Sequence, residues 1–131
     1  MNRFLRGLIL ILLALLVATA AYAQQGPQGR WWRDARVAKA LNLNNGEIQR
    51  LEKAWNRSKM KMIKQKSRVE AEQFKLQTLL EKNKLDEAAV KAQNRKLEQA
   101  RTQLANERTA FVVEVRKIIG SQRFQKLVEM R

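Results

Sequence analysis

The sequence has 131 residues, with 27 Lys and Arg against 12 Asp and Glu, and it contains neither His nor Cys. These absences exclude Ser-His-Asp and Cys-His catalytic triads, zinc sites of the usual His/Cys kind, and disulfides. One Pro, five Gly and 6% aromatic residues are too few for the turns and strands of a β-rich fold. The sequence also has no phosphate-binding loop, nucleophile elbow or dinucleotide fingerprint. We therefore expect one basic, all-α domain that is not an enzyme and uses no cofactor or metal.

The first 23 residues have the pattern of a secretory signal peptide. Arg3 and Arg6 precede an apolar run over residues 7–17, and Ala21 and Ala23 provide the small residues that signal peptidase recognises. We predict cleavage after Ala23 and localisation in the periplasm. A retained signal anchor is the alternative, although the apolar run is shorter than the ~20 residues that a membrane span needs. No Cys follows the run, which excludes a lipoprotein anchor.

The predicted export changes the kind of partner that the positive charge indicates. Cleavage removes two basic residues and no acidic one, which leaves an excess of 13 positive charges. In a cytosolic protein this balance would indicate nucleic acid. Outside the inner membrane the anionic partners are instead acidic or unfolded polypeptides, lipid headgroups and lipopolysaccharide, so we expect no nucleic acid partner. The absence of Cys suits an oxidising compartment.

From residue 30 onward the sequence predicts helix almost without interruption, in a single domain over residues 30–131. Residues 24–29 are polar and contain the only Pro, so we interpret them as a flexible leader. Asn44 or Asn45 and Asp86 are placed to cap helices, and Gly120 stands where a helix end favours a left-handed residue. These signals predict four helices, over residues 30–41, about 46–82, 87–120, and a last short one after Ser121.

Each of the two long segments carries an apolar row in steps of seven residues, formed by Ile48, Trp55, Met62, Val69 and Leu76 in the first and by Val90, Leu97, Leu104, Phe111 and Ile118 in the second. In the first segment the companion heptad position is apolar only at its two ends, Leu51 and Leu79, and is polar at Ser58, Gln65 and Glu72 between them. Two matched seams joined by a short break predict an antiparallel helical hairpin.

One hairpin covers only one apolar stripe of each helix. We therefore expect the short helices to fold back on its open end, or two hairpins to pair, and we favour a cradle-like homodimer. Trp31 and Trp32 begin the ordered region, and one of these rings is expected to clamp the first helix onto the hairpin.

The stretch RSKMKMIKQKSR over residues 57–68 contains six basic residues and no acidic one. The helical spacing places its basic residues Arg57, Lys61, Lys64 and Arg68 on one face, with Met60 and Ile63 among them. We interpret this face as a surface for acidic, partly unfolded chains, attracted by charge and contacted by adaptable apolar groups. The candidate client-binding residues are Arg57, Met60, Lys61, Lys64 and Arg68. A solvated basic face without a partner is the alternative.

Together these features resemble the Spy/CpxP-type periplasmic proteins, a superfamily that includes the ZraP/CnrX-like heavy-metal resistance and sensor proteins. The resemblance is carried by the signal peptide, Trp31-Trp32, LNLNNGEIQRL over residues 41–51, LDEAAV over 85–90, and VRKIIGSQRFQKL over 115–127. The family's repeated Leu-Thr-x-x-Gln motif appears here in altered form, as Leu43-Asn44-Asn45-Gly46-Glu47 and Ile119-Gly120-Ser121-Gln122-Arg123.

The resemblance implies two functional branches. Spy-like members are ATP-independent chaperones that form cradle-shaped helical dimers, whereas ZraP- and CnrX-like members bind metal with His prominent among the ligands. This sequence offers no His for such a site. Our leading hypothesis is a periplasmic holdase-type chaperone or envelope-stress protein. The alternative is a heavy-metal resistance or sensor protein acting as a regulatory adaptor, with a membrane sensor protein as its possible partner. A third hypothesis is an anion-binding protein at the membrane or lipopolysaccharide surface.

Overall fold

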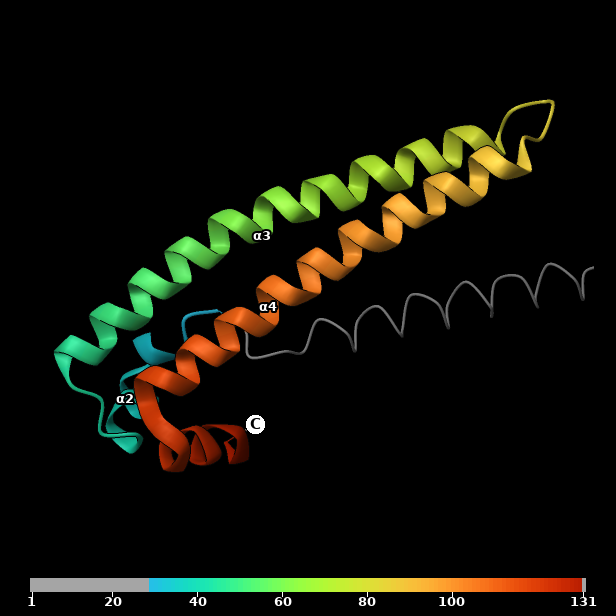
Figure 1. Ribbon diagram of the computed structural model, residues 1–131. Coiled ribbons are helices and arrows are strands. Elements are labelled where there is room, and N and C mark those ends of the chain that lie inside the picture. Colours follow the sequence, from blue (N-terminus) through green and yellow to red (C-terminus); the bar gives the residue numbers. More distant parts are fainter. Residues whose placement is uncertain (1–28, 131) are drawn as a thin grey trace, which may run out of the picture. The chain divides into compact units, whose positions relative to one another are not determined.

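The computed structural model describes residues 29–130, which are almost entirely helical (Figure 1). Its elements are a 3-10 helix η1 (Trp31–Arg33) and the α-helices α2 (Ala35–Ala40), α3 (Asn45–Leu80) and α4 (Glu87–Glu129). The all-α class is confirmed for this part of the chain, in which no strand occurs. No helix within it has both the length and the apolar character to cross a membrane. The predicted signal peptide and the leader up to residue 28 lie outside the described residues.

Residues from Trp32 onward form one compact unit, and its helices begin where the sequence supplies caps. The Asn44 side chain accepts a hydrogen bond from the backbone N–H of Glu47, whose carboxylate accepts one from the backbone N–H of Asn44. This reciprocal capping box starts α3, and the side chain of Asp86 caps α4. The prediction of one helix over residues 30–41 is wrong, because Asp34 adopts an extended backbone conformation and caps α2 separately from η1.

Gly120 interrupts α4. Its backbone, with φ 80° and ψ 173°, is non-helical and lies in a region that L side chains rarely adopt. The chain therefore changes direction, and residues 121–129 turn back from the axis of the preceding helix, as the red segment in Figure 1 shows. The predicted end of the third helix at this glycine, followed by a short last helix, is confirmed.

The helices α3 and α4 pack antiparallel along the hairpin, joined by residues 81–86. Of the predicted apolar rows, Leu97 and Leu104 are buried, and the other positions are half-buried. The companion row also lies between the helices, since Leu51 and Ser58 are buried and Gln65 and Glu72 are half-buried. The prediction of one narrow apolar seam is therefore too simple, because the interface includes a polar row.

A cluster of three aromatic rings lies at the open end of the hairpin, which we call the base. Here the Trp32 ring packs against Trp55 and Phe111, with centroids 6.1 and 6.3 Å away, and the Trp55 and Phe111 centroids are 5.4 Å apart. Trp32 is only 1% exposed, so the prediction that a tryptophan clamps the first helix onto the hairpin is confirmed. The buried residues around this cluster are Leu41, Leu51, Val115 and Ile119.

Candidate interaction surface

All five predicted client-binding residues lie on one exposed side of α3. The row of Trp55, Met62 and Val69 is half-buried toward α4. Because a helix turns about 100° per residue, Met60 and Ile63 face away from the hairpin seam. Met60 is 73% exposed and Ile63 is 57% exposed on that side. Arg57, Lys61, Lys64 and Arg68, which we call the basic stripe, are exposed beside them.

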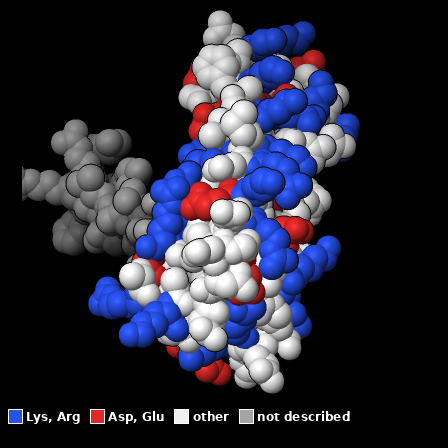
Figure 2. Space-filling view, turned by 90° about the vertical axis from the view of Figure 1, so that its left-hand side faces the viewer, with Lys and Arg blue, Asp and Glu red and all other residues white. Residues whose placement is uncertain are grey.

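The basic stripe has little charge compensation. Within the described residues, no carboxylate lies within ion-pair distance of Arg57, Lys61 or Lys64. Arg68 donates a hydrogen bond from Nη1 to Oε1 of Gln103 on α4, at 2.6 Å, which leaves its charge uncompensated. The side of the molecule in Figure 2, which includes the N-terminal part of α3, carries many Lys and Arg side chains and few, scattered Asp and Glu. Such a surface attracts anionic partners.

Exposed, uncharged side chains on the same side of α3 continue beyond the predicted client-binding residues. Phe74 is 70% exposed and lies fourteen residues after Met60, close to four helical turns, on the same side of α3. Ser67 and Ala71 occupy the turns between Ile63 and Phe74 and are also exposed. We use the name apolar ridge for this line of three large apolar side chains and the two small residues between them, namely Met60, Ile63, Ser67, Ala71 and Phe74. Phe74 was not among the predicted residues, although its spacing from Met60 places it on the same side of the helix.

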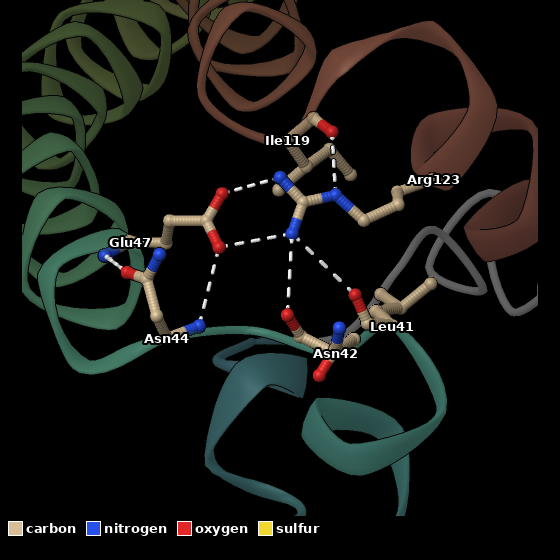
Figure 3. A network of polar contacts seen from close by, with 6 residues as sticks. All are labelled: Leu41, Asn42, Asn44, Glu47, Ile119 and Arg123. Carbon is tan, nitrogen blue, oxygen red and sulfur yellow. Dashed lines mark hydrogen bonds and ion pairs between the residues drawn. The ribbon is translucent and has the colours of Figure 1, made fainter.

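A cluster of polar contacts at the base of the hairpin joins the start of α3 to the segment after Gly120 (Figure 3). The guanidinium of Arg123 donates to both carboxylate oxygens of Glu47, with Nη1 lying 2.9 Å from Oε1. It also donates to the backbone carbonyl oxygens of Ile119 at 2.8 Å, Asn42 at 3.4 Å and Leu41 at 3.5 Å. Glu47 is buried, and the hydrogen bond from Arg123 lowers the pKa of its carboxyl group although burial alone would raise it.

This cluster brings the two altered motif copies together. Glu47 ends the first copy and Arg123 ends the second, at the two positions where the family pattern has Gln. The two departures from the pattern are therefore complementary charges in direct contact. Lys126 adds a hydrogen bond from Nζ to the carbonyl oxygen of Ala40, at 2.8 Å. All these contacts join protein segments to each other, which indicates that the cluster closes the base.

A family model for heavy-metal resistance proteins matches residues 7–126. The chain belongs to the heavy-metal resistance family. This membership confirms the resemblance to the superfamily of the Leu-Thr-x-x-Gln motif and the Spy/CpxP-type proteins. No curated protein and no solved structure shows significant similarity to the chain.

Within residues 29–130, the side chains of this member of the heavy-metal resistance family form no group that could hold a transition metal. The sequence has no His and no Cys. Among residues 29–130, no three Asp or Glu side chains are grouped closely enough to coordinate one ion. Met60 faces solvent while Met62 lies at the seam with α4, so the two thioethers point to different sides of the helix. The remaining donors are scattered carboxylates and thioethers, and imidazole, which suits nickel and zinc, is absent from the sequence.

Proposed function

We propose that this protein is a periplasmic, ATP-independent chaperone of the holdase type that binds unfolded polypeptides on the outer side of α3. The observation that carries this proposal is the position of Met60 and Ile63, which are 73% and 57% exposed within a stretch of six basic residues and no acidic one. Large apolar side chains in water favour a partner that covers them. The surrounding charge favours a partner with acidic segments.

The two kinds of side chain have different parts in this mechanism. The basic stripe accelerates encounter with acidic segments, because attraction between opposite charges acts before contact. Met60 then packs on irregular apolar groups, since its unbranched thioether side chain adapts to many shapes. Binding of this kind is weak and depends on ionic strength, because exposed charges are screened beyond about 8 Å in physiological salt.

We also propose that two hairpins pair into a cradle-like homodimer. Val112 and Val113 on α4 are 42% and 46% exposed, and a single hairpin of this size buries little apolar area. Molar mass from light scattering during size-exclusion chromatography tests this proposal. A monomer at every protein concentration would contradict it.

The chaperone proposal is tested by light scattering from a chemically unfolded, aggregating client protein, with and without this protein, at low and high salt. We expect suppression of aggregation near a stoichiometric ratio, and we expect the suppression to fade as salt increases. A variant with Arg57, Lys61, Lys64 and Arg68 replaced by Glu is expected to lose the suppression while keeping its helical circular dichroism spectrum.

A matched control distinguishes the effect of the basic stripe from the effect of net charge. Lys39, Lys82, Arg95 and Lys117 are exposed and lie outside the basic stripe, and replacing them by Glu changes the net charge by the same amount. We expect this control to keep most of the suppression. Equal loss in both variants would assign the effect to net charge, and full activity of the stripe variant would contradict the role of the stripe.

The family description favours a second candidate function, a metal-responsive regulatory adaptor for an envelope stress-signalling system. Such an adaptor would dock on a membrane sensor protein and need not be a chaperone. Its metal would have to be bound by carboxylates and thioethers, which are poor ligands for nickel or zinc. Calorimetric titration with zinc, nickel, cobalt and copper separates the candidates, because micromolar binding would favour the adaptor and no binding would disfavour its sensing version.

A further inference from the structure

The apolar ridge of α3 is a continuous line of exposed, uncharged side chains. Met60, Ile63 and Phe74 are 73%, 57% and 70% exposed, and the small residues Ser67 and Ala71 lie between them. Fourteen residues at ~1.5 Å each give the ridge a length of about 21 Å. The ridge is therefore a surface along the helix rather than one isolated side chain.

Positive charge borders the ridge on both sides. Helical spacing places Arg57, Lys64 and Arg68 along one flank and Lys59 and Lys66 along the other, and all five are exposed. In the described part of the chain, the acidic residue beside the ridge is Glu70. The carboxylate of Glu72 is turned toward the seam, where Nε2 of Gln93 donates to it at 2.6 Å. Five cations thus border the ridge against one free carboxylate.

We propose that this side of α3 docks lengthwise on a bilayer that contains anionic lipids. The apolar ridge would enter the boundary between headgroups and acyl chains, and the flanking Lys and Arg side chains would bind lipid phosphates. This inference goes beyond the proposed chaperone function, because its partner is a lipid surface rather than a polypeptide. No described helix can cross a membrane, so α3 would lie on the bilayer and not span it.

The arrangement of charge also suits a lipid surface. A bilayer that the ridge enters contacts the ridge and the cations on both flanks at once. Lys and Arg also have long aliphatic stems that can lie along the apolar surface while their charged ends reach the phosphates. Phe74 is the one large ridge side chain outside residues 57–68, which contain the proposed client-binding residues.

The test is sedimentation of the protein with vesicles of phosphatidylglycerol mixed with phosphatidylcholine, compared with vesicles of phosphatidylcholine alone. We expect binding to the anionic vesicles only. Replacing Phe74 by Gln is expected to weaken this binding about tenfold, because the transfer of one buried aromatic side chain is lost. Val128→Gln, which replaces another exposed apolar residue away from the ridge, in the segment after Gly120, is the control and is expected to bind normally.

Insertion is measured separately with brominated phospholipids, which quench a nearby tryptophan. We expect added quenching in Phe74→Trp and none in Val128→Trp, each compared with the natural protein. No binding to anionic vesicles, or binding without any effect of Phe74→Gln and without quenching at residue 74, would overturn the proposal, the second result indicating adsorption by charge alone. Client light scattering with Phe74→Gln keeps the two proposals apart, since we expect this variant to retain chaperone activity.

Discussion

The base of the hairpin and its shaft, by which we mean α3 and α4 between the base and residues 81–86, are stabilised differently. At the base, Trp32, Trp55 and Phe111 contact one another, and an ion pair between Glu47 and Arg123 joins segments far apart in sequence. Along the shaft, apolar rows alternate with polar side chains. Ser58 Oγ and Gln65 Oε1 are buried there without a hydrogen-bond partner among the described residues.

This difference separates stability from binding. The base buries large side chains and satisfies its buried charges, which are the features that make local structure resistant to opening. The shaft has unpaired polar atoms on its inner side and carries both the basic stripe and the apolar ridge on its outer side. A partner can therefore bind the shaft without disturbing the contacts that stabilise the base.

The largest effect is expected from removing the central ring of the base. Trp32→Ala should lower the free energy of unfolding by about 3–5 kcal/mol, because it deletes a fully buried aromatic side chain and leaves a cavity. Urea unfolding followed by circular dichroism measures this loss. Phe74→Ala, which removes an exposed aromatic residue from the shaft, is the control and should change stability by less than about 0.5 kcal/mol. Similar losses in the two variants would contradict the comparison.

The next largest effect concerns the ion pair. Glu47→Gln should cost about 1.5–3 kcal/mol, since it leaves the charge of Arg123 without its carboxylate partner. The double variant Glu47→Gln with Arg123→Gln restores the family residue at both motif positions and should cost less than the two single changes together. A double-mutant cycle in urea measures this coupling. Strict additivity would show that the contact does not stabilise the base.

A smaller effect of opposite sign is expected in the shaft. Ser58→Ala should raise the free energy of unfolding by about 1 kcal/mol, because it removes a buried hydroxyl group without a hydrogen-bond partner. Ser67→Ala in the same helix is the matched control, since it gives the same gain in helix propensity at an exposed position. If both substitutions stabilise the protein equally, burial of the Ser58 hydroxyl has no cost.

The pH dependence of the free energy of unfolding also tests the difference between the base and the shaft. Arg123 holds the pKa of Glu47 below its ordinary value of 4.5, so the ionised carboxylate is favoured in the folded protein. This contribution is fully present above pH 4.5 and is lost as the pH falls through the lowered pKa. Glu47→Gln should therefore lose less stability than the natural protein when urea unfolding is repeated below pH 4.5. Parallel losses in the two proteins would contradict the role of this carboxyl group.

Local sequence signals were sufficient to predict most of the fold. Heptad spacing and the caps Asn44 and Asp86 located α3 and α4, because a helix and its start depend on neighbouring residues. The exposed positions of the predicted client-binding residues followed from the same spacing. Their function as a binding surface remains a prediction.

The interactions between distant segments could not be predicted in this way. Nothing local indicates that Glu47 meets Arg123, because the two residues are 76 positions apart and each is an ordinary charged residue in its own helix. The polar residues Ser58, Gln65 and Glu72 occupy the companion heptad position, which the prediction of one narrow apolar seam left out of the interface. A search for apolar residues does not reveal that polar side chains also lie in the interface.

The long separation between Glu47 and Arg123 has a consequence for the order of folding. Contacts beside residues 81–86 are local and close short loops, whereas the base requires residues 32–55 to meet residues 111–126. The contacts between α3 and α4 should therefore form first beside residues 81–86, and those of the base should form last. Stopped-flow kinetics of Glu47→Gln should then show faster unfolding with nearly unchanged refolding, so the ion pair sets how long the native state lasts rather than how quickly it forms.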